Sequence, residues 1–82
     1  MNRQTVMAAA TEFVGQHINA TEIDPEIDLF TSGMVNSLFA MQMVLFVERE
    51  FNLPVENEDL DYANFRSLHA IVDFVGRKLN LA

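Results

Sequence analysis

The sequence contains no cysteine and no tryptophan, and it has only one tyrosine, three glycines and two prolines. Without cysteine, disulfide bonds, thiolate metal sites and cysteine nucleophiles are all excluded. No stretch reaches the roughly 18–20 apolar residues that span a bilayer. The N-terminal stretch MNRQTVMAAATEF also lacks the uninterrupted apolar core of a signal peptide. These absences predict a cytoplasmic protein that does not insert into a membrane.

Basic residues are also scarce, with five lysines and arginines against twelve acidic residues and a net charge of -7. Ten of the twelve acids lie between Glu22 and Asp61, where Arg49 is the single base. Such a field repels nucleic acid phosphates and speeds encounters with basic protein surfaces. Nucleic-acid binding is therefore excluded. The acids serve either simple solubility or the attraction of a basic partner.

The length of 82 residues and the 50% hydrophobic content predict one small globular domain, residues 1–82. Asn2 can cap a first helix that runs to about Ile18, and Ser67 can cap a last helix that runs to about Leu79. Each shows one apolar stripe at helical spacing: Val6, Ala10, Phe13 and Val14 in the first, and Leu68, Ile71, Val72, Val75 and Leu79 in the last. No segment alternates with period two.

A long loop and a short helix complete the predicted fold. Residues 19–36 form a long connection, because Asp24-Pro25 breaks a helix and Thr31-Ser32-Gly33 is typical of a turn. Four apolar residues can pin this loop to the core: Ile23, Ile27, Leu29 and Phe30. A short helix or turn, capped by Asn57, is expected over residues 57–62. The predicted fold class is all-α, a small bundle of three main helices plus one short helix, with a long loop between the first and second helices.

The second helix, expected from about Ser37 to Phe51, has too many apolar residues for one core-facing stripe. Every residue from Leu38 to Val47 is apolar except Gln42. At 100° per residue, one group faces the core: Ala40, Met43, Val44, Val47 and Phe51. Phe39 and Phe46 lie on a flank and are expected to be partly buried. Leu38, Met41 and Leu45 fall on the opposite side, which predicts an exposed docking surface. The alternatives are a cover provided by the long loop or by a second copy of the chain.

Asn36 and Ser37 stand at the start of this helix, and either can serve as its cap. Nothing nearby activates Ser37 as a nucleophile, because His17 and His69 lie in other helices and form no recognisable serine–histidine motif with it. An exposed hydroxyl at a helix N-terminus suits a phosphate ester, since the helix dipole favours the added negative charge. A functional Ser37 is therefore expected to be modified by another protein.

The residues around Ser37 resemble an acyl carrier protein. The resemblance rests on Asp28-Leu29, on Gly33, on Asn36-Ser37-Leu38 and on a helix that ends in Glu-x-Glu-Phe, and VENEDLDYANFRSLHAIVDFV extends it over nearly the whole chain. In that family, a separate magnesium-dependent transferase moves 4'-phosphopantetheine from coenzyme A to the serine. The resemblance therefore implies that Ser37 is the attachment point. It also implies a carrier whose thioester chemistry belongs to the cofactor and to visiting enzymes.

The resemblance also implies which residues meet these enzymes. The partner-binding set comprises Asn36, Leu38, Met41 and Leu45 on the second helix or at its start, and the acids Glu48, Glu56, Glu58 and Asp59, which would steer basic partners. The expected partners are a phosphopantetheinyl transferase, an acyl- or aminoacyl-loading enzyme, and tailoring dehydrogenases or an acyltransferase or synthase. The carrier itself is expected to be a monomer.

Two departures from the family pattern refine these expectations. Asn36 replaces the usual aspartate before the serine, which removes a charge that a basic transferase could use. Phe39 and Met41 stand where many fatty-acid carriers have polar or acidic residues, so docking should be more apolar and less sensitive to salt. The run VNSLFAMQMVLFVERE is most similar to free-standing carriers of polyketide and hybrid peptide pathways, which hold hydroxymalonyl, methoxymalonyl or aminomalonyl units.

Other classes of function fit the sequence less well. A peptidyl carrier usually shows Gly-Gly-His/Asp-Ser, which Met34-Val35-Asn36-Ser37 does not match. DPEIDLFTSGMV lacks the sixth-position glycine and the twelfth-position glutamate of a calcium-binding EF-hand loop. An enzyme is disfavoured because no paired carboxylates, metal-ligand spacing or phosphate-binding glycine loop is found. The principal alternative is an acidic helical adaptor that binds a partner helix non-covalently through its second helix.

Overall fold

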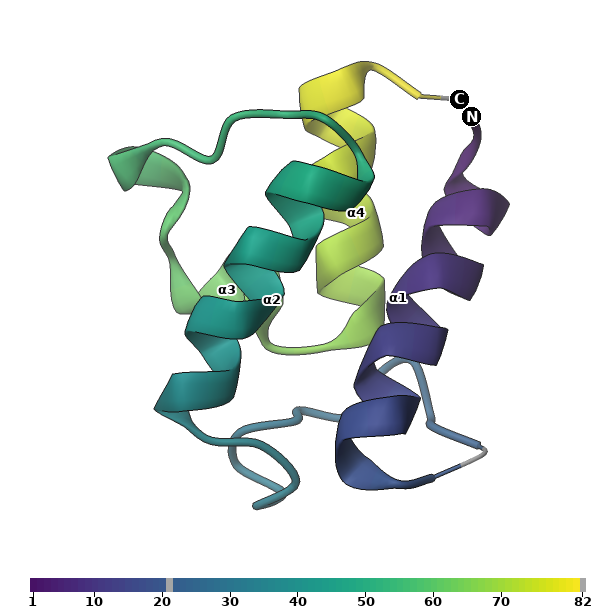
Figure 1. Ribbon diagram of the computed structural model, residues 1–82, viewed down its shortest axis with the longest axis vertical. Helices are drawn as coiled ribbons and strands as arrows, with labels where there is room; N and C mark the ends of the chain where they lie inside the picture. Colours follow the sequence, from purple (N-terminus) through teal and green to yellow (C-terminus); the bar gives the residue numbers. More distant parts are fainter. Residues whose placement is uncertain (21, 82) are drawn as a thin grey trace.

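The computed structural model describes residues 1–20 and 22–81. The elements are α1 (Arg3–Ile18), α2 (Ser37–Glu50), the 3-10 turn η1 (Asn57–Asp59), α3 (Tyr62–Phe65) and α4 (Leu68–Leu79). Within the described residues there is no strand, which confirms the predicted all-α class with three main helices. α1 and α4 pack against each other, and the long loop passes beneath the lower ends of α1 and α2 (Figure 1).

Side chains that were predicted from the sequence cap the long helices. The Asn2 side chain accepts a hydrogen bond from the backbone N–H of Thr5 at 2.9 Å, and the Ser67 hydroxyl accepts one from Ala70 at 3.1 Å. The cap of α2, for which two candidates were open, is Asn36. Ser37 is consequently the first residue of α2, and its hydroxyl is not needed as a cap.

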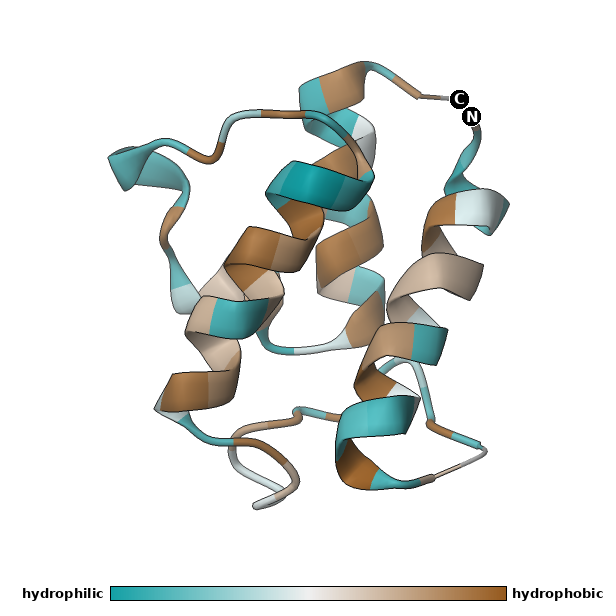
Figure 2. Cartoon of the chain, viewed as in Figure 1, coloured by the Kyte–Doolittle hydropathy of each residue, from teal (hydrophilic) through white to brown (hydrophobic). Residues whose placement is uncertain are grey.

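The core forms where the helical stripes meet. The predicted stripe residues Val6, Ala10 and Val14 of α1 are at most 1% exposed, and four of the five predicted for α4 are also buried: Leu68, Ile71, Val72 and Val75. Figure 2 shows that α2 is apolar over most of its length and becomes hydrophilic in its last turn, and that η1 is hydrophilic. The stripes therefore account for the packing of α1 and α4 but leave part of apolar α2 without a helix to cover it.

Three core predictions need correction. Phe39, expected on a partly buried flank, is 1% exposed because its ring stacks against Phe13, with centroids 5.4 Å apart, and against His17 at 3.8 Å. Ala40 and Val44, expected in the core, are only half-buried because they line a pocket. The remaining predicted positions of α2 are as expected, with Met43, Val47 and Phe51 buried and Phe46 half-buried.

The segment expected to form one short helix over residues 57–62 forms two elements instead. η1 ends at Asp59, and its cap is Glu56 rather than Asn57. The Asp59 carboxylate accepts a hydrogen bond from the N–H of Glu56 at 3.0 Å, which closes the turn on itself. α3 then starts at Tyr62, where the Asp61 side chain accepts from the N–H of Ala63 at 2.9 Å.

The long loop is fixed to the bundle, as its apolar residues predicted. Leu29 is fully buried, and its N–H donates to the carbonyl oxygen of Arg66 at 2.7 Å. Ile23, Ile27 and Phe30 are half-buried against the core. Gly33 has φ +83°, a left-handed conformation that glycine adopts freely, so the predicted turn is present. Over the described residues, no helix is both long and apolar enough to cross a membrane.

An ion pair fastens η1 to the last helix. The Lys78 ammonium lies 2.8 Å from the carboxylate of Asp59, whose side chain is only 15% exposed. The hydrogen bond from Lys78 is the main reason that the pKa of Asp59 lies below its ordinary value, and the same bond raises the pKa of Lys78. Protonating Asp59 therefore weakens the contact between η1 and α4.

This ion pair predicts a dependence of stability on pH. A carboxyl whose pKa is lowered by folding stabilises the protein above its unfolded pKa of about 4, and that contribution disappears as the pH falls through the folded pKa. We expect Asp59→Asn to lower the free energy of unfolding at neutral pH and to approach the wild type in acid. Urea unfolding at neutral pH and in acid measures the difference in the free energy of unfolding between the wild type and Asp59→Asn. Glu58→Gln, at an exposed position, is the control. A constant difference between wild type and Asp59→Asn across the pH range would contradict it.

Candidate functional site

Ser37 differs from the two other serines of the chain in what its hydroxyl contacts. Ser67 is 2% exposed and caps α4. The Ser32 hydroxyl donates to the carbonyl oxygen of Leu29 at 3.1 Å and accepts from the N–H of Met34 at 3.4 Å. Ser37 is exposed, and within the described residues no hydrogen bond engages its hydroxyl. It is the serine that another protein can most easily modify.

The start of α2 is shaped around this hydroxyl. The Asn36 side chain accepts from the N–H of Phe39 at 3.0 Å, and buried Phe39 anchors the same turn to α1. A helix start leaves its first N–H groups without intrahelical partners and carries a partial positive charge. A negatively charged group esterified to Ser37 would therefore lie in a favourable field on a rigid support.

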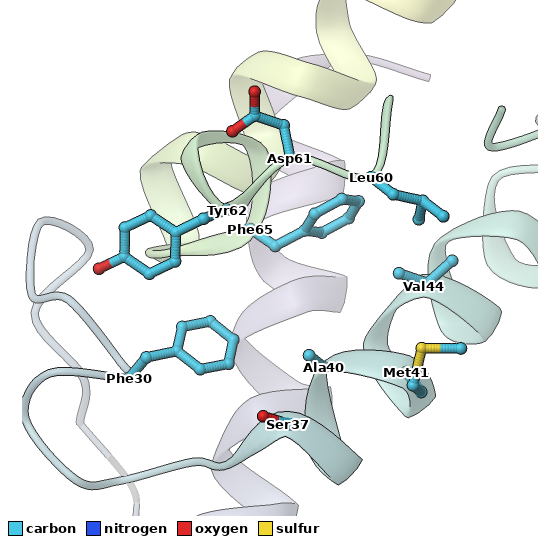
Figure 3. Close-up of a pocket in the computed structure, with 9 residues that line it drawn as sticks. All are labelled: Phe30, Ser37, Ala40, Met41, Val44, Leu60, Asp61, Tyr62 and Phe65. Atoms are coloured by element: carbon cyan, nitrogen blue, oxygen red, sulfur yellow. The ribbon is translucent and has the colours of Figure 1, made fainter. Parts of the chain in front are cut away.

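A pocket of about 300 Å³ opens beside Ser37. Its lining comes from three elements: Phe30 of the long loop, Ser37, Ala40, Met41 and Val44 of α2, and Leu60, Asp61, Tyr62 and Phe65 on the opposite side. Figure 3 shows Ser37 next to Ala40 at one border, with apolar side chains around most of the remainder. An apolar group held near Ser37 could leave water by entering this pocket.

Leu38, Met41 and Leu45 form an exposed apolar surface on α2, which we call the docking face. Their exposed fractions are 69%, 59% and 55%. The long loop does not cover them, so the alternative that this loop buries the apolar side of α2 is wrong. Met41 also lines the pocket, so the docking face and the pocket share a border. The sequence thus identified the exposed side of α2 correctly, and its use in docking stays a prediction.

Three of the four acids predicted to steer partners also hold the fold together. The Glu48 carboxylate accepts from the N–H of Val55 at 3.1 Å, Asp59 pairs with Lys78, and Glu56 lies 3.4 Å from the same ammonium. Glu58 is exposed. Sequence reasoning missed these contacts because the partners lie seven or more positions away. Their role in steering stays a prediction.

Both histidines are engaged away from Ser37. His17 stacks on Phe39, and the Nδ1 atom of His69 lies 2.8 Å from the Glu26 carboxylate. Within the described residues, no hydrogen bond joins either ring to Ser37, and no group of three His, Cys, Asp or Glu side chains is arranged to hold a metal ion. The geometry around Ser37 therefore presents a hydroxyl without showing a base that would activate it.

Comparison with known protein families matches residues 4–75 to the family described as the phosphopantetheine attachment site. The match covers well over half of the chain, so the protein belongs to this family of carrier domains. Its members bear covalently attached 4'-phosphopantetheine, are carriers rather than catalysts, and work with phosphopantetheinyl transferases and acyl-processing enzymes. A search of curated proteins found no match. The family match confirms the resemblance to carrier proteins, while the extender-unit subfamily stays a prediction.

The residues present fit the prosthetic group. It attaches to a serine hydroxyl through a phosphate, and Ser37 offers an exposed hydroxyl at the positive end of a 14-residue helix. The pocket and the docking face begin within one turn of that hydroxyl, at Ala40, Leu38 and Met41. A hydroxyl, a rigid helix start and an apolar surface are what such a carrier needs from its own chain.

Proposed function

We propose that Ser37 carries 4'-phosphopantetheine and that the protein holds an acyl or aminoacyl thioester for partner enzymes. The observation that supports this most strongly is that Ser37 is exposed and that its hydroxyl makes no hydrogen bond to any described residue, whereas Ser32 and Ser67 use theirs within the fold. When bound, the prosthetic group supplies the thiol that bears the cargo. Asn36 and Phe39 hold the helix start in place, so Ser37 is presented to each partner in the same geometry.

The proposed partners contact the docking face. They are a phosphopantetheinyl transferase, a loading enzyme, and tailoring dehydrogenases or an acyltransferase or synthase. No charged residue occurs between Ser37 and Phe46, so contact here is made by Leu38, Met41 and Leu45. Glu58 and the other acids beyond α2 contribute a longer-range attraction to basic surfaces. Flexible methionine suits a surface that accepts several partners in turn.

The pathway is the most specific part of the proposal. The run VNSLFAMQMVLFVERE favours polyketide or hybrid polyketide/peptide biosynthesis, with hydroxymalonyl, methoxymalonyl or aminomalonyl units as the cargo. We further propose that the carrier is a single domain, that it is a monomer and that it works in the cytoplasm. Size-exclusion chromatography with light scattering tests the monomer, and a stable dimer would contradict it.

Intact-protein mass spectrometry tests the carrier function. The purified protein is incubated with coenzyme A, magnesium and a broad-specificity phosphopantetheinyl transferase, beside a known carrier as the positive control. We expect the mass to increase by one phosphopantetheine. An unmodified protein in a reaction that loads the control carrier would contradict the proposal and favour the non-covalent adaptor.

Met41→Glu tests the docking face. Placing a charge in an apolar contact adds a desolvation penalty of about 1–3 kcal/mol, which corresponds to a roughly five- to 150-fold lower kcat/KM for the transferase. The fold should be retained because Met41 is 59% exposed. Glu58→Gln is the control and should alter kcat/KM only at low salt, where attraction between exposed charges is least screened. Unfolding of Met41→Glu, seen by circular dichroism, would instead place Met41 in the core.

A further inference from the structure

A hydrogen bond joins the long loop to α3 beside the pocket. The Asp28 carboxylate accepts the N–H groups of Phe30 at 2.9 Å and Thr31 at 3.0 Å through one oxygen, and the Tyr62 hydroxyl through the other. The bonds from Thr31 above all, and that from Phe30, keep the pKa of Asp28 below its ordinary value. Asp28 is therefore an ionised acceptor held in place by its own turn.

The aromatic rings of the two joined segments form one side of the pocket. Phe30 and Tyr62 are tilted against each other at 57°, with centroids 5.8 Å apart, and both line the pocket. In Figure 3 the two rings lie together on the side away from Met41, Val44 and Leu60, and the Tyr62 hydroxyl points outward. The bond to Asp28 thus sets how close these two rings lie.

The other contacts of α3 tie it to α4, to η1 through the bond from the Asn64 side chain to the carbonyl oxygen of Asp59, and to the loop through the Arg66 carbonyl oxygen at its C-terminal end. Phe65 packs on Phe74 with centroids 5.3 Å apart, and Arg77 donates to the Asn64 side chain at 3.0 Å. Among the described residues, no hydrogen bond connects α3 with α2. The loop is therefore held to both ends of α3, by the Leu29 N–H at Arg66 and by the Tyr62 hydroxyl at the start of the helix. Loss of the Tyr62 bond would free the end of α3 that lies beside Phe30 and would open the pocket there.

We propose that Tyr62 is a specificity-determining residue: its bond to Asp28 closes the Phe30 end of the pocket and so excludes long acyl chains carried from Ser37, while short acyl groups fit. This role rests on the proposed function, in which the acyl group is carried on Ser37. Ser37 itself lines the pocket, so the carried chain starts at the pocket's border. The bond between Tyr62 and Asp28 that closes the pocket is present in the unmodified protein. It can therefore be tested separately from loading.

Hydrogen exchange of the unmodified protein tests the closure. Tyr62→Phe keeps the ring and removes the hydroxyl. We expect the amides of Ala63 and Asn64, which bond to Asp61, to exchange about fivefold faster, the factor set by one net hydrogen bond. The exchange rate of the Ala70 amide, which lies in α4 and donates to the hydroxyl of the cap residue Ser67, should be unchanged. Equal exchange at Ala63 and Asn64 in both proteins would overturn the closure.

Acyl-chain length tests the specificity. A broad-specificity transferase loads the wild type, Tyr62→Ala and Leu60→Ala from hexanoyl-, decanoyl- and hexadecanoyl-coenzyme A, and hydroxylamine cleavage of each thioester is timed. We expect protection of the short chain in all three proteins and of longer chains only in Tyr62→Ala. Leu60 is the matched control because it lines the pocket with the same 51% exposure as Tyr62, and no hydrogen bond joins it to the described part of the loop.

Two results would overturn the specificity role. One is the same chain-length limit in the wild type and Tyr62→Ala. The other is an equal shift in Leu60→Ala, because any enlargement of the pocket would then suffice. A failure to load any chain would contradict the proposed function instead, and the exchange measurement would still decide whether Tyr62 closes the pocket.

Discussion

Ser37→Ala is expected to abolish phosphopantetheine attachment completely while the protein remains folded. The substitution removes the hydroxyl oxygen that forms the phosphate ester. It removes no helix cap, because Asn36 caps α2. A surface substitution of this kind changes the free energy of unfolding by about 0.5 kcal/mol or less. Intact mass after transferase treatment measures attachment, and thermal unfolding followed by circular dichroism measures stability.

Ser32→Ala is the matched control for this experiment. Ser32 lies five residues before Ser37 and is also exposed, but its hydroxyl bonds the carbonyl oxygen of Leu29. We expect Ser32→Ala to load like the wild type. Attachment to Ser37→Ala, or its loss from Ser32→Ala, would contradict the assignment of the site.

Phe39→Ala is expected to lower the free energy of unfolding by about 3–5 kcal/mol, the range found when a buried phenylalanine is truncated. Phe39 is 1% exposed and stacks on Phe13 and His17, so its removal leaves a cavity between α1 and the start of α2. Small domains have a total stability of about 5–15 kcal/mol, so this loss is a large fraction of the total and should lower the urea midpoint markedly. Urea unfolding followed by circular dichroism measures the loss.

Phe46→Ala separates this effect from a general loss of aromatic area. Phe46 also stacks on Phe13, at a centroid distance of 4.2 Å, but it is only half-buried. Because less apolar area is returned to water, we expect a smaller loss for Phe46→Ala. An equal loss in the two variants would mean that Phe39 has no special part in anchoring the start of α2.

The sequence predicts much of this fold because its signals are local. Asn2 and Ser67 stand just before apolar stripes of helical period, and both are the caps observed. The same periodicity placed Leu38, Met41 and Leu45 on the outer side of α2, where the structure has them exposed. Caps and stripes depend on residues three or four positions apart, so one sequence is enough to identify them.

Features that depend on distant partners could not be predicted in this way. Phe39 is buried because α1 brings Phe13 and His17 to it, and helical periodicity holds no information about that partner. The bond between Asp28 and Tyr62 joins residues 34 positions apart. The pocket beside Ser37 likewise exists only once the loop, α2 and α3 meet. The sequence motif was therefore enough to identify Ser37, but it could not identify the residues that line the pocket beside it.

The most direct test is to locate the modification among the three serines. The loaded protein is digested, and tandem mass spectrometry reads which fragment carries the added group. A single modified residue at position 37, with both other serines bare, is the predicted result, because that hydroxyl alone among the three is exposed and without a hydrogen bond in the described structure. Modification of a different residue, with position 37 intact, would contradict the assignment on which the carrier function, the docking face and the role of the pocket all depend.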